Sequence, residues 1–456
     1  MKAARIILIV VAGLVVVVTL LVAAGLYMAN RHVQSPAFKQ EILTVARQEL
    51  GADVHIEALH ASLFSGMTLD GVTINNPTNF PGSLLTADSF VLRYRLWPLI
   101  EKRVEIEQLS LDKPVITLVR DNAGEWNYEQ LGAKPSESKP PSATKPSISP
   151  PPAKSETAIP FNLVLSKLAI AHGSVSITGE KDKPLLRLDG INLSSSLNVA
   201  DGNLGGSGKS SIDRVNVAEK LFVQQLAAPV SISSEHVKLA PLSGKIADGA
   251  IMGEATMELK PTFGYAADVQ IKESDVAKLL GEAGAKQVLI GKLELTTKLN
   301  GTGGLATMAG TGRAEVRNGH LASIPLMNLL ATLLQVPDLR ELPFTECLLE
   351  FSITNNTMVT PVIRIVSPEV QITGKGVVSL EDYSLNHNLT IAFARGMLDR
   401  APTEVRNLFT EQTNGWLALE FRVWGPYDSP QTDLQTRIAK GVGQQLLQKG
   451  LQKLFK

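Results

Sequence analysis

The sequence predicts a mostly β protein: an amino-terminal transmembrane helix, then a curved antiparallel sheet with a few helices and an amphipathic helix at the carboxyl end. Three observations predict this fold. A long uncharged apolar run opens the chain. Beyond it, apolar residues mostly recur at every second position, which is the period of a strand with one apolar face. Turn signals such as Asp-Gly and Asn-Gly recur between these segments and favour hairpins.

The apolar run at residues 6–29 has the length of a membrane-spanning helix. It contains no charge and follows Lys2 and Arg5. At about 1.5 Å per residue it spans roughly 36 Å, enough for a bilayer core of about 30 Å. A cleaved signal peptide is the alternative, but such peptides have a shorter apolar stretch, and residues 26–28 do not form a small-residue cleavage site. We therefore expect a retained anchor, with residues 1–5 cytoplasmic and the body on the far side.

A segment rich in proline and serine interrupts the rest of the chain. Residues 133–158 contain seven prolines, six serines and four lysines. Because proline lacks an amide donor and this composition cannot line a core, we expect an extended, solvated linker. The linker would separate a module at residues 33–132 from a larger β-rich region at residues 159–430.

Alternating segments on both sides of the linker define the expected strands. The turn signals between them include Asp201-Gly202-Asn203, Asp248-Gly249 and Asn318-Gly319. Because such turns join antiparallel neighbours, we expect an antiparallel sheet rather than βαβ units. The apolar residues that alternate with polar ones, and so share one face of their strands, are Val104, Ile106, Leu385, Leu389, Ile391, Leu417, Leu419, Phe421 and Val423.

A degenerate repeat underlies this alternation: a leucine-rich strand, a turn and a second short strand. It occurs as VEIEQLSLDKPVITLVRDNAGEW, LVLSKLAIAHGSVSITG, GTGRAEVRNGHLASI and CLLEFSITNNTMVTPVIRI. Helices are expected to interrupt the strands at residues 36–51, 276–290, 325–335 and 402–410.

The last segment, residues 431–456, predicts a basic amphipathic helix. Its apolar residues can share one helical face, and no acidic residue follows Asp433. Such a helix suits a membrane surface, and the alternative is a helix that caps the open end of the sheet. The basic residues that would contact a membrane surface are Arg437, Lys440, Lys449, Lys453 and Lys456.

Composition excludes several classes of function. The chain carries 44 basic and 44 acidic residues and only 5% aromatic residues, so no nucleic-acid-binding surface is indicated. The single cysteine, Cys347, excludes an intramolecular disulfide, which a large domain does not need even in an oxidising compartment.

Motifs for catalysis and cofactor binding are incomplete. Residues 205–210, GGSGKS, end like a phosphate-binding loop, but Asn203 replaces the first glycine and a strand-like stretch follows. Residues 301–306 match a dinucleotide fingerprint only loosely, because another strand-like stretch follows them. His55 and His60 have no further metal ligands near them. We therefore expect no catalytic site, no cofactor and no metal.

Several motifs nevertheless resemble one known family. After the apolar run come HASLFSGMTLDGVTINN, LTADSF and LWPLIEKRVEIEQLSLDKPVITLVRDNAGEWNY, and the distal part contains GTGRAEVRNGHL and FSITNNTMVTPVIRIVSPEVQITGKGVVSLEDYSLNHNL. These segments are similar to the AsmA family of envelope proteins of Gram-negative bacteria. Only residues 160–300 match it by pattern alone. The residues that carry the most specific resemblance are Trp97, Pro98, Leu99, Asp121, Gly124 and Trp126.

The resemblance implies an inner-membrane anchor, a periplasmic body and kinship with bridge-like lipid carriers of the repeating β-groove type. It also implies a role in outer-membrane biogenesis and lipid homeostasis, by binding or moving phospholipid. This chain resembles a short member, since 20 to 25 strands at about 4.8 Å would extend at most about 100–120 Å. We therefore expect an outer-membrane or periplasmic partner protein.

The physical question is what covers the apolar face of the sheet. In ordinary domains, a second sheet or helices cover it and form a closed core. In a trough, lipid acyl chains would occupy it, at a gain of about 0.8 kcal/mol per buried methylene. Periodicity alone favours the closed core, and the resemblance favours the groove. A further alternative is a scaffold or assembly factor for the targeting of outer-membrane proteins, whose strand edge engages client strands.

Overall fold

A computed structural model of the chain confirms the mostly β architecture. It describes residues 36–62, 66–77, 79–95, 98, 103–129, 131, 162–200, 203–259, 264–302, 307–322, 324–399, 401, 403–427, 429–434 and 436–437. Strands make up most of these residues and form a large curved mixed sheet with few helices. The apolar run at residues 6–29 and the linker at residues 133–158 lie outside the described residues.

The chain divides into two compact units, which are described separately below. The amino-terminal unit extends to Glu219 and includes Gln225–Leu239, and the carboxy-terminal unit comprises Lys220–Gln224 and the chain from Ala240 onward. Strands β9 (Leu221–Ser233) and β10 (His236–Ile246) contain the division. The units therefore divide in the middle of the β-rich region, well beyond the predicted linker.

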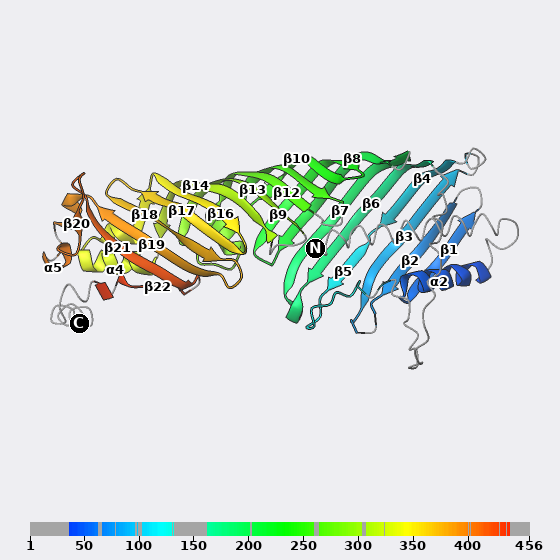
Figure 1. The fold of residues 1–456 in the computed structure, drawn as a ribbon, viewed down its shortest axis with the longest axis horizontal. Coiled ribbons are helices and arrows are strands. Elements are labelled where there is room, and N and C mark those ends of the chain that lie inside the picture. Colours follow the sequence, from blue (N-terminus) through cyan, green and yellow to red (C-terminus); the bar gives the residue numbers. More distant parts are fainter. Residues whose placement is uncertain are drawn as a thin grey trace, which may run out of the picture. The chain divides into compact units, whose positions relative to one another are not determined.

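The described part of the amino-terminal unit consists of the α-helix α2, a short 3-10 helix and a sheet (Figure 1). Neighbouring strands from β1 to β4 pair in antiparallel fashion, as do β6, β7 and β8, and β5 also pairs with β3. Its elements are α2 (Pro36–Leu50), β1 (Val54–Ser62), β2 (Gly66–Asn75), β3 (Ser83–Arg95), β4 (Arg103–Asp112), β5 (Val115–Val119), β6 (Asn162–Thr178), the 3-10 helix η2 (Glu180–Asp182), β7 (Pro184–Ala200) and β8 (Asn203–Val217).

The expectation of a purely antiparallel sheet is corrected at β6. This strand runs parallel to both β4 and β5. Parallel neighbours need a connection of a dozen residues or more, and the chain between Val119 and Asn162, which contains the predicted linker, is long enough. The strands before and after the linker thus lie side by side in one unit.

Two copies of the predicted repeat pair with each other. Val104 lies opposite Leu163 and Val115 lies opposite Ser174, so the offset between the paired residues is the same along both pairings. Between these points, Lys113 and His172 both have a positive φ, of 44° and 54°. The two copies of the repeat therefore also share the residue with positive φ, which lies between the first and second strand segments of each copy.

Helix α2 covers one face of the amino-terminal sheet. Its apolar residues Phe38, Ile42, Leu43 and Ala46 recur at helical spacing, and all four are buried. They pack in a core with residues of β1 to β4, and with Leu165 of β6. The sequence prediction of a helix at residues 36–51 is confirmed.

The carboxy-terminal unit is an antiparallel meander, and its described helices are inserted at three points: after β12, after β14 and after β19. Its elements are β11 (Gly249–Glu258), β12 (Gly264–Asp275), α3 (Val276–Glu282), β13 (Leu289–Thr302), β14 (Ala309–Ala322), α4 (Pro325–Leu334), η4 (Pro337–Arg340), β15 (Glu341–Phe344), β16 (Glu346–Thr354), β17 (Thr357–Val366), β18 (Val370–Ser379), β19 (Ser384–Phe393), η5 (Arg395–Leu398), α5 (Thr403–Arg406), β20 (Thr410–Glu411), β21 (Leu417–Pro426) and β22 (Gln431–Thr432).

Two of the expected helices are shorter than the sequence indicates. Helix α3 begins at an N-cap, where the Asp275 carboxylate accepts a hydrogen bond from the Lys278 amide at 2.9 Å, and it ends at Glu282. The chain then re-enters the sheet at Leu289, within the predicted helix at residues 276–290. Helix α5 has only four residues of the predicted 402–410. The prediction for residues 325–335 is confirmed by α4, which ends at Gln335 in a left-handed cap.

The turn signals had mixed outcomes. Ala247 and Asp248 both have positive φ between β10 and β11, as a two-residue hairpin turn requires. Asn318-Gly319 is not a hairpin turn. It lies inside β14 at a shift in the register with β13, which makes it a β-bulge. An asparagine with φ of 52° followed by glycine suits either structure, so the dipeptide alone does not separate them.

Candidate functional site

Strand register places the apolar residues of the carboxy-terminal unit on one face of the sheet. Leu295 of β13 lies opposite Ala314 of β14, which lies opposite Leu349 of β16, and Leu349 lies opposite Ile363 of β17. Residues directly opposite each other in antiparallel strands project to the same side. The face continues through β18 and β19 to Phe421 in β21, so a single apolar surface crosses these strands.

Protein covers the part of this face nearest the helices. A buried core joins residues of α4, η5 and α5 to residues of β18, β19 and β21. The sequence predicts a lipid-lining role for several of these strand residues, and the structure places protein side chains against them. The predicted groove residues that are buried in this core are Ile391, Leu417, Leu419 and Phe421, and those packed against it are Leu389 and Val423.

The rest of the face lies beyond this core. Its apolar side chains are only half-buried, and they belong to none of the three core clusters that the described residues form. We call this surface the open apolar face. Its residues include Leu295, Leu299, Leu349, Phe351, Ile363 and the predicted groove residue Leu385.

Glycines leave space on the open apolar face for the large side chains of neighbouring strands. A Cβ atom added to Gly312 would lie 2.2 Å from Cζ of Phe351, and one added to Gly310 would lie 2.8 Å from Cδ2 of Leu299. The large side chains therefore lie across their glycine neighbours, where any other residue would displace them. Phe351 thus covers Gly312, and Leu299 covers Gly310, on this face.

The amino-terminal unit has an apolar face of the same kind. Ile106, a predicted groove residue, is buried in the core under α2. Val104 lies in β4, and its side chain is outside the described set. Further from α2, half-buried apolar residues lie opposite each other in β6, β7 and β8. These residues are Ile170, Leu193, Ile191, Ile212, Val199 and Leu204.

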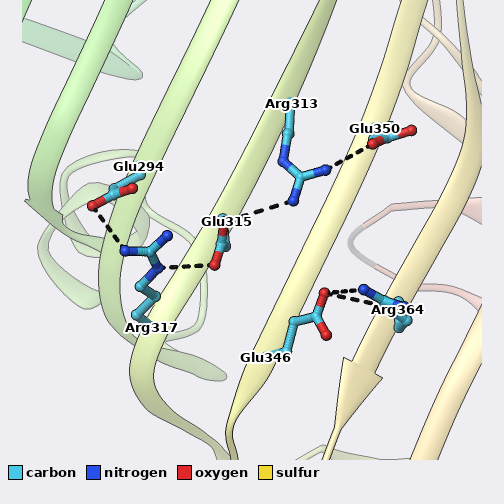
Figure 2. A network of polar contacts seen from close by, with 7 residues as sticks. All are labelled: Glu294, Arg313, Glu315, Arg317, Glu346, Glu350 and Arg364. Atoms are coloured by element: carbon cyan, nitrogen blue, oxygen red, sulfur yellow. Dashed lines mark hydrogen bonds and ion pairs between the residues drawn. The ribbon is translucent and has the colours of Figure 1, made fainter.

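The opposite face of the carboxy-terminal sheet is polar. Figure 2 shows a ladder of arginine and glutamate residues that crosses β13, β14, β16 and β17. Arg317 bonds to Glu315 at 2.8 Å and lies 3.5 Å from Glu294, and Arg313 bonds to Glu350 at 2.9 Å. The Arg317 hydrogen bond lowers the pKa of Glu315. Because the arginines are about half exposed, each pair adds little stability, but the ladder identifies this face as the solvated one.

One buried polar pair interrupts the apolar face. His387 lies opposite Val423 of β21, and its Nε2 is 3.0 Å from the Thr360 hydroxyl. Both residues are buried, and burial lowers the pKa of His387 below its ordinary value of 6.5. The neutral imidazole is therefore the form that the folded protein favours.

This lowered pKa predicts a pH-dependent stability. The unfolded chain takes up a proton at His387 at a higher pH than the folded chain does. The stabilisation is therefore complete above about pH 6.5 and is lost as the pH falls toward the folded-state pKa. We expect the thermal unfolding midpoint to fall between pH 7 and pH 5, and to fall less in His387→Gln. His60→Gln, at an exposed histidine, is the control, and equal pH slopes in the wild type and His387→Gln would contradict the assignment.

The Asp121, Gly124 and Trp126 motif forms a structural turn. The Asp121 carboxylate accepts hydrogen bonds from the amides of Ala123 and Glu125 at 2.9 and 2.8 Å, and Gly124 has a φ of 85°. Trp126 stacks on Tyr128 at 5.8 Å between ring centroids, beside the core of Leu84, Leu118 and Ile177. These residues hold the segment after β5 against the sheet.

Sequence reasoning missed the residue that anchors this turn. Asn127 is fully buried, and its Nδ2 donates to Asn76 Oδ1 and to the Thr117 carbonyl, both at 2.8 Å. Its Oδ1 accepts from the Val119 amide at 3.1 Å. The only signal was its place directly after Trp126 in the family-like motif.

Side chains and short strands contact the outer sides of β1 and β21. At β1, Lys39 and Arg47 of α2 donate hydrogen bonds to the carbonyls of Glu57 and Val54. At β21, the short strands β20 and β22 pair with its ends, and Asp433 accepts a hydrogen bond from the Arg422 amide at 2.7 Å. These contacts reduce the backbone groups open to strand addition by a client protein.

The incomplete chemical motifs lie in strands. Residues 205–210 are inside β8, rather than in a loop before a helix or at a hairpin tip, and Gly301 is in β13. His55 and His60 lie on β1, and the described residues contain no group of side chains that could hold a metal ion. Burial raises the pKa of Cys347 to about 11, so its thiol stays protonated.

Several predicted residues lie outside the described part of the chain. They are Trp97, Leu99, Lys440, Lys449, Lys453 and Lys456. Pro98 is half-buried, and Arg437 is exposed and pairs with Asp433 at 2.7 Å. Among the described helices, none combines the length and the apolar character needed to span a bilayer.

Comparison with known families gives one result. A model of the AsmA family matches residues 1–209, which include the helix and the strands from β1 to β7. Comparisons with curated proteins and with solved structures give no match.

Proposed function

Since this chain belongs, through residues 1–209, to the AsmA family, we propose that it binds phospholipid on its apolar sheet faces and passes it along them. The protein acts in outer-membrane biogenesis and lipid homeostasis. Residues 6–29 anchor it in the inner membrane, with the body in the periplasm. The lysines of the last segment contact a membrane surface, and a partner protein extends its reach.

The open apolar face of the carboxy-terminal unit carries this proposal. Leu349 and Phe351 are half-buried residues on one side of β16, and Glu350 between them lies in the arginine ladder on the other side. Each acyl methylene buried against such a face gains about 0.8 kcal/mol, and two acyl chains bring many methylenes. A closed core would bury Leu349 and Phe351 as it buries Leu419.

Binding of this kind needs no catalytic group. Lipid that lies on a continuous apolar surface exchanges one set of carbon contacts for the next as it moves. Of the ionisable side chains on this face, His387 is buried and bonds to Thr360, and the thiol of Cys347 stays protonated. The protein is therefore proposed as a carrier rather than an enzyme.

Site-specific photocrosslinking in living cells with labelled phospholipid tests the proposal. We expect label on a probe at Leu349 and none on a probe at Glu350, because these neighbours project to opposite faces. Label at neither position, with the protein folded and anchored, would contradict lipid binding on this face. Equal label at both would indicate contact with bulk membrane instead.

Charge insertion provides a second test with a matched control. Leu295→Asp places a carboxylate on the open apolar face, whereas Thr296→Asp places it on the solvated face of the same strand. We expect Leu295→Asp to reduce co-purified phospholipid about tenfold or more, since burying an unpaired charge costs several kcal/mol. Thr296→Asp should retain its lipid. Unchanged loading of a folded Leu295→Asp variant would rule out the groove at this position.

A further inference from the structure

The described helices of the carboxy-terminal unit all enter at one edge of its sheet. Helix α3 follows β12 at Asp275, α4 follows β14 at Ala322, and η5 follows β19 at Phe393. Because neighbouring strands are antiparallel, β12, β14 and β19 run in the same direction and end at the same edge, which we call the helix edge. The described connections at the opposite edge, the turn edge, include Asn355–Asn356 and the turn at residues 380–383.

Burial of the apolar face falls from the helix edge toward the turn edge. Along β19, Ile391 is completely buried, Leu389 packs against the covered core and Leu385 is half-buried outside it. Along β13, Leu293 packs against the same core and Leu295 does not. A phosphate group placed in that core would lose its hydration without gaining a partner. A phospholipid on the open apolar face would therefore point its headgroup toward the turn edge.

Two exposed tyrosines lie at the turn edge. Leu385 lies opposite Gly425, and Tyr427 comes two positions after Gly425, which places it on the side of the open apolar face. The Tyr427 amide donates to the Tyr383 carbonyl at 3.2 Å, and the two rings meet edge to face at 6.2 Å between centroids. Tyr383 is 50% exposed and Tyr427 is 53% exposed. Both rings therefore have surface available to a ligand at this edge.

The turn that contains Tyr383 is acidic. Residues 380–383 include Glu381 and Asp382 and no basic residue. Hydrogen bonds from Ser379 and Ser384 lower the pKa of Asp382, which keeps its carboxylate ionised. Negative charge therefore adjoins the exposed tyrosines in sequence, within one short turn.

The basic residues of the neighbouring strands lie on the other face of the sheet. Lys375 of β18 lies opposite Asn388, which lies opposite Arg422 of β21, and Asn388 projects away from the side of Leu389. An anionic headgroup at the turn edge would thus meet carboxylates without the help of these two cations. An ammonium group would instead be attracted both by the carboxylates and by the faces of the tyrosine rings, which bind cations.

We infer that the turn edge is a headgroup site, where a phospholipid on the open apolar face places the ammonium group of a zwitterionic headgroup against the rings of Tyr383 and Tyr427. This inference rests on the proposed binding of phospholipid. It adds the edge at which the headgroup lies and the class of headgroup that is favoured. The acyl chains lie along the strands with their ends toward the helix edge, and Glu381 and Asp382 supply negative charge beside the ammonium group.

Lipid competition on the full-length protein tests the class of headgroup. Vesicles with equal amounts of phosphatidylethanolamine and phosphatidylglycerol offer an ammonium and an anionic headgroup, and mass spectrometry of the lipid that re-purifies with the protein gives their ratio. We expect this ratio in the wild type to exceed that in Tyr383→Leu/Tyr427→Leu by about two- to fivefold, as for exposed cation–π contacts. Tyr383→Phe/Tyr427→Phe keeps both rings and is the matched control, which should keep most of the preference. Total bound lipid should be equal in the three proteins.

The position of a label on the lipid tests the edge. Phosphatidylethanolamine with a photoreactive group in its headgroup should label the turn at residues 380–383. The same lipid with the group at the end of an acyl chain should instead label Ile363 and Leu389, which lie nearer the helix edge.

The inference would be overturned by an equal lipid ratio in the wild type and the leucine variant, or by reversed labelling of the two edges. It would also be overturned if the phenylalanine variant lost as much preference as the leucine variant, because the hydroxyl groups rather than the rings would then be responsible. In each of these cases phospholipid is still bound, so the proposed function stands. Absence of both lipids from the folded wild-type protein would contradict the proposed function itself, and this inference with it.

Discussion

Replacing Phe393 by alanine should lower the free energy of unfolding of the carboxy-terminal unit by about 3–5 kcal/mol, the usual range for a buried phenylalanine. Phe393 is fully buried at the end of β19, and its ring meets Phe409 edge to face at 5.6 Å between centroids. Truncation would leave a cavity between the sheet and the helices that cover it. Hydrogen exchange measured on peptides from β19 and β21 would report the loss in this unit separately from the rest of the chain.

Leu221→Ala is the matched control, because Leu221 belongs to the same unit but is 40% exposed. It should change stability by no more than about 0.5 kcal/mol. A small effect of Phe393→Ala would mean that the helices do not pack on this face. Leu419 and Phe421 would then again be candidate lipid-contacting residues. If the large effect is found, a charge at Leu419 or Phe421 tests folding rather than lipid binding.

The second large effect is expected at Asn127. Leucine has the same branched arrangement of heavy atoms, although it is larger, and it removes the partners of Asn76, Thr117 and Val119. Each buried polar group left without a partner costs about 1–3 kcal/mol, so we expect a loss of about 2–4 kcal/mol in the amino-terminal unit. The midpoint of thermal unfolding and the exchange rate of the Val119 amide would both show it.

Asn198→Leu serves as the control for this prediction, since Asn198 is an exposed asparagine on β7 of the same unit. It should unfold within about 0.5 kcal/mol of the wild type. If Asn127→Leu retained both its unfolding midpoint and the protection of the Val119 amide, the hydrogen bonds around Asn127 would not stabilise this unit.

Local sequence predicted the direction in which side chains point, because this direction is set within each strand. Alternation at Leu417, Leu419 and Phe421 correctly placed these residues on one face, and Glu420 and Arg422 on the other. The same reasoning found α2 and α4, whose apolar residues and termini follow helical rules. It also found the motif at residues 121–126, which proves to be a turn.

Local sequence could not predict what lies against each face. Leu385 and Ile391 have the same pattern on the same strand, yet Leu385 is half-buried and Ile391 is completely buried. The difference arises from the residues of α4, η5 and α5, which come from two separate insertions in the chain. The parallel pairing of β6 with β4 likewise depends on a partner that is distant in sequence.

The sequence by itself thus determined the strand-rich class, the two faces of each strand and the match of residues 1–209 to the AsmA family. Only the tertiary structure decided which part of the apolar face is covered and that Asn127 is a buried anchor. The physical reason is that side-chain direction follows from backbone geometry within a few residues. Burial and contact depend instead on the register between strands and on helices inserted far away in the chain.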